Sequence, residues 1–140
     1  MIYSNHLELL QKEIDTSKSM LNLPDDWDDE GSVRIDPEAW ELSVKTAKDI
    51  FDFVYDLQGR FVPIPDITPY CDGSVDVFFK NEKLVLLLNV KKSSTIEENE
   101  NDNISFYGDY NSSGKDKIRG YYTNPKSVGY WLNERLREGI

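Results

Sequence analysis

The sequence predicts an α+β domain with two N-terminal helices, an antiparallel β-meander of three to four strands, and a C-terminal helix. Apolar residues recur at helical spacing in the first part of the chain and again near its end. Between residues 74 and 122 they alternate with polar residues or form short continuous runs, as in strands. Helices that flank a run of strands favour an antiparallel sheet covered on one face. With 140 residues, the chain is expected to form one α+β domain over 1–140.

The first predicted helix ends before Pro24, because proline and the acidic run after it stop a helix. The N-terminus has no basic stretch followed by an apolar one, so no signal peptide is expected. The longest apolar run is too short to cross a bilayer.

One helical face carries the apolar residues Tyr3, Leu7, Leu10, Ile14 and Leu21, with Ser17 on the same face.

The second predicted helix has clear signals at both ends. Asp36 is a suitable N-cap, Pro37 suits the first helical position, and Glu38 complements the positive end of the helix dipole. Gly59 is suited to the position after the last turn. The apolar stripe consists of Trp40, Val44, Ala47, Phe51 and Val54.

The prolines of residues 61–70 allow strand pairing only at a sheet edge, or not at all. Residues 91–103 are polar and acidic, so they are expected to form a mobile acidic loop. A final helix should begin at an Asn124 cap with Pro125 in the first position. The strands are predicted at 74–80, 84–90 and 104–110, with a possible fourth at 117–122.

The net charge of −10 argues against nonspecific binding to nucleic acid or to anionic lipid. Residues 115–137 are the exception, with six basic residues against two acidic ones. This basic end either lies beside the chain's own acidic surface or leaves that surface to a basic partner. The single cysteine, Cys71, permits no intrachain disulfide and is consistent with a cytoplasmic protein.

The most acidic segment is residues 25–32, where carboxylates surround one tryptophan. It is either a binding site or a structured connection between two helices. In the second interpretation, Trp27 fills a gap in the core, Gly31 makes the turn and the acids face water. The candidate binding residues are Asp25, Asp26, Asp28, Asp29 and Glu30.

The same segment partly matches a calcium-binding loop. Counting Asp26 as position 1 puts Asp28 at position 3, Glu30 at position 5 and Gly31 at position 6. Position 12, which should be a bidentate Glu, is Pro37. No metal or other cofactor is therefore expected, and Asp26, Asp28 and Glu30 are the residues that would bind one.

Other residues with catalytic chemistry are scattered. Asp66, Asp72 and Asp76 could supply paired carboxylates, but acid–base catalysis needs a shared pocket and separated pKa values. His6 and Cys71 have no neighbours in the sequence that indicate a metal or nucleophilic site.

Aromatic residues crowd the C-terminal third, interleaved with Lys115, Lys117 and Arg119. They can form core, a protein interface, or a stacking surface for single-stranded nucleic acid, in decreasing order of expectation. They are Phe106, Tyr107, Tyr110, Tyr121, Tyr122, Tyr130 and Trp131.

Residues 20–90 resemble an uncharacterised family of small bacterial and phage proteins. The resemblance lies in a Trp-Asp-x-x-Gly-Ser/Ala segment at residues 27–32, a following amphipathic helix, the proline-rich stretch 63–69, and Asp72-Gly73 before a β-meander. It implies a similar fold and brings no established activity. Asp25, Asp26 and Asp29 are not part of the family pattern.

These observations favour a non-enzymatic, acidic protein-binding module whose partner has a basic surface. An antitoxin, immunity protein, defence inhibitor or chaperone in a bacterial, archaeal or phage setting would fit. The alternative is a small carboxylate-dependent or divalent-metal-binding enzyme. Neither a membrane nor nucleic acid is expected as a partner.

Overall fold

A computed structural model describes residues 2–91, 103–112 and 114–138. Its helices are α1 (Ile2–Ser17), the 3-10 helix η1 (Lys18–Asn22), α2 (Pro37–Gln58) and α3 (Lys126–Glu138). No helix in these ranges has the length and apolarity to span a bilayer. Most of the predicted acidic loop lies outside the described residues. The strands are β1 (Asp66–Pro69), β2 (Val75–Lys80), β3 (Leu84–Val90), β4 (Ile104–Tyr110) and β5 (Lys117–Tyr121).

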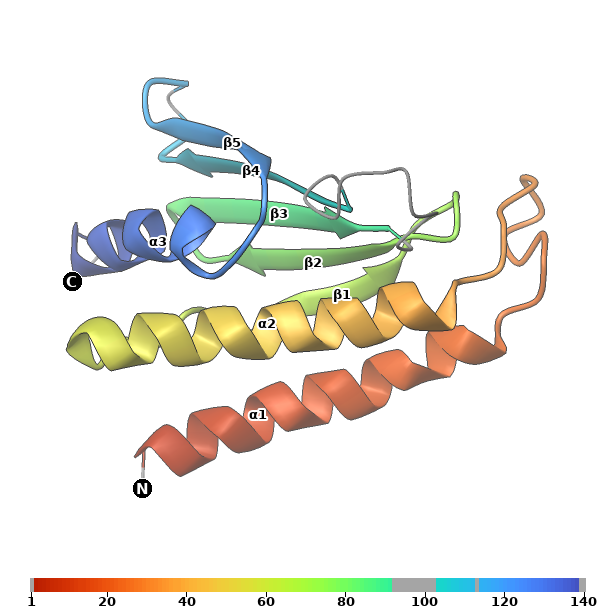
Figure 1. Ribbon diagram of the computed structural model, residues 1–140, viewed down its shortest axis with the longest axis horizontal. Coiled ribbons are helices and arrows are strands. Elements are labelled where there is room, and N and C mark those ends of the chain that lie inside the picture. The colour runs from red at the N-terminus through yellow and green to blue at the C-terminus, as the bar shows by residue number, and fades with distance from the viewer. Residues whose placement is uncertain (1, 92–102, 113, 139–140) are drawn as a thin grey trace.

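The described strands form one antiparallel sheet in the order β1-β2-β3-β4-β5 (Figure 1). The α+β class is confirmed, but the prediction of three to four strands is wrong, because the proline-rich stretch contributes β1. This strand lies at the edge of the sheet, where a proline such as Pro69, which has no N–H, is tolerated. The N–H of Ile67 in the same strand donates to the Glu13 carboxylate of α1 over 3.1 Å. Helix α1 thus covers this edge of the sheet.

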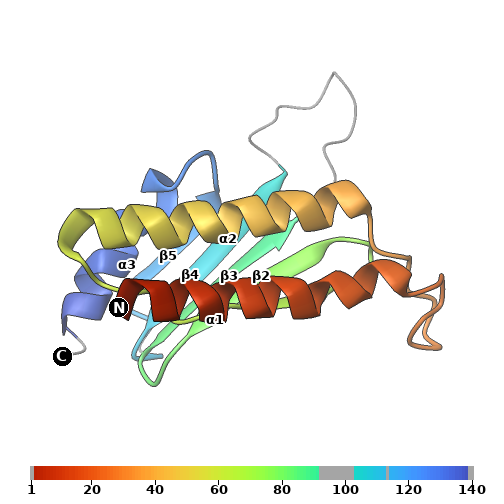
Figure 2. The same ribbon diagram turned by 90° about the horizontal axis from the view of Figure 1, so that it is seen from below.

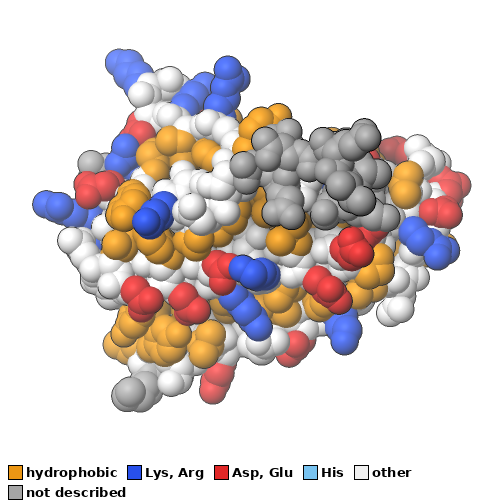
Figure 3. Space-filling view, viewed as in Figure 1, with side chains coloured by type: hydrophobic (Ala, Val, Ile, Leu, Met, Phe, Trp, Pro, Cys, Tyr) orange, Lys and Arg blue, Asp and Glu red, His pale blue; other side chains and the backbone are white. Residues whose placement is uncertain are grey.

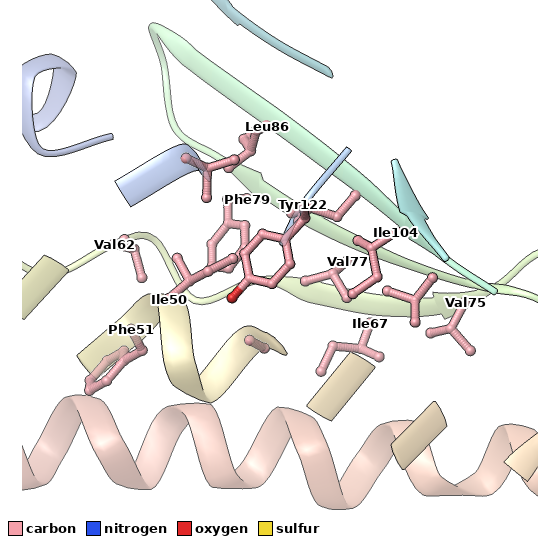
Figure 4. Packing of buried hydrophobic residues seen from close by; sticks show 14 of the residues in the cluster. Ile50, Phe51, Val62, Ile67, Val75, Val77, Phe79, Leu86, Ile104 and Tyr122 are labelled. Atoms are coloured by element: carbon pink, nitrogen blue, oxygen red, sulfur yellow. The ribbon is translucent and has the colours of Figure 1, made fainter. Parts of the chain in front are cut away.

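The described α-helices, α1, α2 and α3, lie on one face of the sheet (Figures 1 and 2). Side chains alternate along each central strand, so that Val75, Val77 and Phe79 are fully buried while the residues between them are not. Figure 4 shows Ile50 between α2 and the sheet, whereas Phe51 lies on the side of α2 next to α1. Burying one such side chain contributes about 1.5–3 kcal/mol.

The caps predicted for the last two helices are present. Asp36 Oδ1 accepts from the Glu38 N–H over 2.8 Å at the start of α2, and Gly59 follows its end with a φ of 72°. Asn124 Oδ1 accepts from the Lys126 N–H over 2.9 Å at the start of α3. These local signals place both helices along the chain.

Trp40 joins the first two helices. Its indole N–H donates to the Ser17 hydroxyl over 2.9 Å at the end of α1, and its ring packs against the core. Leu10 and Ile14 of α1 are buried as predicted, but Leu7 is 39% exposed. The apolar contact of α1 is therefore concentrated in its second half and in Tyr3, which contacts Phe51 and Tyr55.

Helix α3 covers the β4–β5 end of the same face. The ring of Trp131 lies so close to Gly108 that a Cβ at that position would be 3.0 Å from its Cη2 atom. The Asp116 carboxylate accepts the Trp131 indole N–H over 3.0 Å and pairs with Arg135. The opposite face of the sheet carries no helix among the described residues.

Candidate functional site

The segment of residues 25–32, here the 25–32 loop, connects η1 to α2 and closes on itself. The Asp26 N–H donates to the Ser32 carbonyl over 2.6 Å. Directly after the loop, the Val33 N–H donates to the Cys71 carbonyl over 2.9 Å, and the Asp36 N–H donates to the Gly73 carbonyl over 3.1 Å. The loop therefore adjoins the turn between β1 and β2.

Gly73 permits this contact. A Cβ at residue 73 would lie 3.0 Å from the Arg34 carbonyl oxygen, and the φ of Gly73 is 90°. The Trp-Asp-x-x-Gly-Ser segment and the Asp72-Gly73 turn are far apart in the sequence, yet they adjoin in space. Their association gives both motifs a structural role in this chain.

Three carboxylates hold the backbone of the 25–32 loop. Asp25 Oδ1 accepts from the Arg34 N–H over 3.0 Å, and Asp26 Oδ1 accepts from the Gly31 N–H over 2.6 Å. Asp28 accepts from the Glu30 N–H over 3.0 Å and from both the N–H and the hydroxyl of Ser32. The Ser32 hydroxyl bond, followed by the backbone bond from Glu30, lowers the pKa of Asp28. The Asp28 carboxylate therefore remains charged while it fixes the loop.

The backbone of the loop is strained at defined positions. Asp26 and Asp29 have φ values of 60° and 59°, in the left-handed region that asparagine and aspartate tolerate better than most residues. Gly31 has a φ of 85° with open space around it, so its conformation and not its size requires glycine. Such strain persists only where surrounding bonds hold it in place.

The carboxylates of Asp29 and Glu30 have a different environment. Both residues are exposed, and neither side chain has a hydrogen-bond or ionic partner among the described residues. The loop thus combines an anchored part, Asp25, Asp26 and Asp28, with an acidic tip that faces solvent.

The structure does not arrange the candidate metal ligands as a cluster. No group of three or more His, Cys, Asp or Glu side chains in the described ranges is placed to hold a metal ion. Asp26 and Asp28 direct oxygens at N–H groups of their own loop, which occupies lone pairs that a cation would need. Glu30 extends from the exposed tip.

Trp27 belongs to the loop rather than to the core. It is half-buried, its indole N–H donates to the Val33 carbonyl over 3.1 Å, and it is not among the side chains packed against the hydrophobic cluster. The expectation that it fills a core gap between the helices therefore does not describe its position, which Trp40 takes instead. Its indole hydrogen bond ties the loop to Val33, the residue directly after it.

The other candidate carboxylates lie at the β1–β2 end of the sheet. Burial alone raises the pKa of Asp72, but the hydrogen bonds that it accepts from the hydroxyl and N–H of Ser74, together with the charge of Lys91, leave that pKa lowered. Asp76 is half-buried, and burial, together with the charge of Asp72, raises its pKa against the lowering effect of an Asn89 hydrogen bond. Asp66 and Asp76 line one hollow of about 280 Å³ with Thr68, Phe78 and Leu87.

His6 and Cys71 show no paired arrangement. The His6 ring stacks on Phe61 with centroids 3.8 Å apart, and its Nδ1 lies 2.9 Å from the Ile2 carbonyl oxygen. Cys71 is exposed in the β1–β2 turn. Each has a role in local packing or in the turn.

The helix-free face carries neighbouring residues of several strands whose proximity the alternation within each strand did not predict. The strand register places Phe78, Leu87 and Tyr107 side by side on this face, flanked by Asp66 and Arg119. Leu87 is 36% exposed and Tyr107 is 41% exposed. Alternation within each strand predicts which residues share a face, but their alignment across strands requires the register.

No protein-family model, curated protein or solved structure matches this chain. The resemblance to the Trp-Asp-x-x-Gly-Ser/Ala family therefore stays a prediction.

Proposed function

We propose that this chain is a non-enzymatic acidic module that binds another protein, with the 25–32 loop as its contact surface. One observation carries the proposal: three carboxylates fix the loop, while Asp29 and Glu30 at its tip have charges that no described residue pairs. A preformed loop loses little conformational entropy on binding. The contact surface comprises Asp25, Asp26, Asp28, Asp29 and Glu30.

The distribution of charge supports a basic partner. Figure 3 shows acidic side chains at the right-hand end, where the 25–32 loop lies, with basic atoms beside them, and Lys and Arg gathered at the upper left around β5. The basic residues of β5 therefore do not lie beside the loop. Arg34 pairs with Asp25, its Nε 3.9 Å from Asp25 Oδ1, whereas Asp29 and Glu30 have no such partner in the described part of the chain. Complementary charge of this kind accelerates association and is weakened by salt.

Antitoxins, immunity proteins, defence inhibitors and chaperones of bacteria, archaea or phages are classes that use such docking, and we place this chain among them. The cytoplasm is the proposed compartment, on the basis of cysteine usage. The acidic composition disfavours nucleic acid and anionic membranes as partners.

Affinity capture from a host-cell lysate at low salt tests the proposal. Asp29→Asn and Glu30→Gln together remove two charges that have no partner within the described residues, so the fold should be unchanged. The captured protein should be recovered with the wild-type chain and strongly reduced with this double variant. Raising the salt concentration should reduce capture by the wild-type chain in the same way.

Glu8→Gln with Glu41→Gln is the matched control, because it removes the same charge from exposed sites on α1 and α2. This control should capture the partner as the wild-type chain does. Equal recovery with all three proteins would show that the 25–32 loop is not the contact surface. Recovery of nothing at low salt would contradict the protein-binding proposal itself.

The alternative, a carboxylate-dependent or divalent-metal-binding enzyme, is supported by a different place. Asp66 and Asp76 share a hollow, and the pKa of Asp76 is raised by burial, which is a feature of catalytic acids. Thermal unfolding with and without magnesium, manganese or zinc separates the two functions, since a metal that binds only the folded state raises the melting temperature. A metal-dependent rise abolished by Asp76→Asn would favour the enzyme.

A further inference from the structure

On the helix-free sheet face, the register aligns one residue from each described strand in a row at right angles to the strands. We call this row the central row. From β1 to β5 it reads acid, aromatic, aliphatic, aromatic, base: Asp66, Phe78, Leu87, Tyr107 and Arg119. The row thus has opposite charges at its two ends and Leu87 at its midpoint.

A second row on the same face repeats this antisymmetry over strands β2 to β4. The register aligns Lys80 of β2, Val85 of β3 and Asp109 of β4, and Lys117 of β5 follows Asp109 in the same row. Here the base lies on the β2 side and the acid on the β4 side, again with an aliphatic residue of β3 between them. The two rows therefore share one midline, which follows β3.

Asp109 supplies an independent observation. Its Oδ1 atom is buried and has no hydrogen-bond partner among the described residues. A buried carboxylate oxygen without a partner is costly, so a donor from outside this part of the chain would relieve it. Lys117, the register neighbour of Asp109 on β5, has its Nζ 5.8 Å from the Tyr107 ring centroid and makes no hydrogen bond to this oxygen. A second cationic group approaching the helix-free face is the donor that fits.

We propose that a second copy of this chain covers the helix-free face, related to the first by a two-fold axis that runs parallel to β3 between the two sheets. This rotation places β1 opposite β5 and β2 opposite β4, while β3 faces its own copy. Phe78 then lies opposite the partner's Tyr107, and Asp66 lies opposite the partner's Arg119. Lys80 lies opposite the partner's Asp109, which receives the donor it lacks.

The shape of the face agrees with this arrangement. The hollow lined by Asp66, Thr68, Asp76, Phe78 and Leu87 lies on the β1–β3 half. Tyr107 and Tyr121 protrude from the β4–β5 half, with exposures of 41% and 57%. A two-fold axis along β3 puts the tyrosines of each copy over the hollow of the other. Stacked sheets about 10 Å apart and crossing at about −30° would keep the closest contacts on the central strands.

Other ways of covering the sheet fit less well. Pairing of two β5 edges in antiparallel register about residue 119 would set Arg119 against the partner's Arg119, and like charges opposite each other destabilise a sheet. Nucleic acid would need a predominantly basic face, whereas Asp66, Asp76 and Asp109 balance Lys80, Lys117 and Arg119 here. The alternation of both signs about one midline favours a second copy.

Sedimentation velocity over a dilution series tests the proposal. The wild-type chain should be a dimer at high concentration, and Leu87→Lys should raise the dimer dissociation constant by about a hundredfold or more, because two lysines would meet at the axis. Leu9→Lys is the matched control, since Leu9 is an exposed leucine of α1 on the other side of the molecule. The control should dimerise as the wild-type chain does.

A charge exchange makes the test independent of any loss of folding. Asp66→Arg alone sets two bases opposite each other at both ends of the central row, and Arg119→Asp alone sets two acids opposite each other. Each single variant should weaken the dimer, and the chain that carries both substitutions should regain it, because complementarity is restored. Neither side chain has an ionic or hydrogen-bond partner among the described residues of its own chain.

A wild-type chain that stays monomeric at high concentration would overturn the proposal. So would a dimer that is unaffected by Leu87→Lys, or a double exchange that does not restore what the single exchanges remove. The proposal does not rest on the function of the 25–32 loop. Asp29→Asn with Glu30→Gln should leave the dimer intact, so loss of partner capture and loss of dimerisation are separable results.

Discussion

Gly129 of α3 lies directly on the ring of Phe53 in α2. A Cβ at residue 129 would be 2.2 Å from Phe53 Cδ1 and 2.4 Å from Cε1, much closer than two carbon atoms can approach. Phe53 also contacts Tyr130 edge-on, with ring centroids 5.3 Å apart, so its ring is held from a second side. The close packing of α3 on α2 depends on the absence of a side chain at residue 129.

Gly129→Ala should therefore destabilise the fold, although alanine is the better helix former. The gain in helix propensity is about 1 kcal/mol, whereas overpacking costs about 1–3 kcal/mol. We expect a net loss of about 1 kcal/mol in the free energy of unfolding, measured by urea denaturation. Glu134→Ala, at an exposed site of the same helix, should change stability by a few tenths of that amount. A more stable Gly129→Ala variant would show that Phe53 moves freely.

The two tryptophans near the first helices should respond differently to truncation. Trp40 packs against the core and bonds Ser17, so Trp40→Ala should cost about 3 kcal/mol or more. Trp27 only closes the 25–32 loop, so Trp27→Ala should cost about 1 kcal/mol, near the value of one hydrogen bond. Urea denaturation of both variants measures the difference. Equal losses would mean that Trp27 contributes to the core after all.

Asp116 links α3 to the β4–β5 hairpin, and its contribution to the free energy of unfolding should depend on pH. The hydrogen bond from Arg135, with a further one from the Trp131 indole, lowers the pKa of Asp116 although burial opposes the shift. A lowered folded-state pKa contributes stability above the unfolded pKa of about 3.9, and that contribution is lost as the pH falls through the folded value. Asp116→Asn should cost about 1–2 kcal/mol at pH 7.

The difference between the wild-type chain and Asp116→Asn should then shrink as the pH falls below about 4. Urea midpoints measured from pH 7 down to pH 3 give this dependence. Asp56→Asn, at an exposed site of α2, should show little difference at any pH. A difference for Asp116→Asn that does not change with pH would mean that the lost bond, and not the charge, is responsible.

Local signals in the sequence account for much of the fold. Asp36, Pro37 and Gly59 place α2 because each satisfies a requirement of a helix end through its own backbone or side chain. Alternation predicts the buried face of β2 in the same way. These features depend only on residues that are adjacent in the sequence, so they can be predicted from it.

Features that depend on distant neighbours were not predictable in this way. The strand β1 requires the free edge of β2 and the Glu13 carboxylate of α1, neither of which is near it in the sequence. Trp27 and Trp40 look equally apolar, and only the packing of α1 on α2 shows which one joins the core. The opposite charges of Asp66 and Arg119 become one row only when four strand registers are known.

Asp76 should weaken the fold at neutral pH. Burial, and then the charge of Asp72, raises its pKa, while the Asn89 bond opposes this shift. When the folded-state pKa of a carboxyl is raised, its contribution to the stability of the fold is fully present below the unfolded-state pKa of about 3.9. That contribution is lost as the pH rises through the folded-state pKa. Asp76→Asn removes the charge and keeps an oxygen that can accept from Asn89. This variant should be more stable than the wild-type chain at pH 7.

The advantage of Asp76→Asn should disappear as the pH falls below about 4, where the wild-type carboxyl is itself protonated. Urea denaturation of the two proteins across this range, at a concentration low enough to keep both monomeric, measures it. Asp29→Asn is the control, because that carboxylate is exposed and has no partner among the described residues. Lower stability of Asp76→Asn at pH 7 would mean that the charge strengthens the Asn89 bond by more than its burial costs.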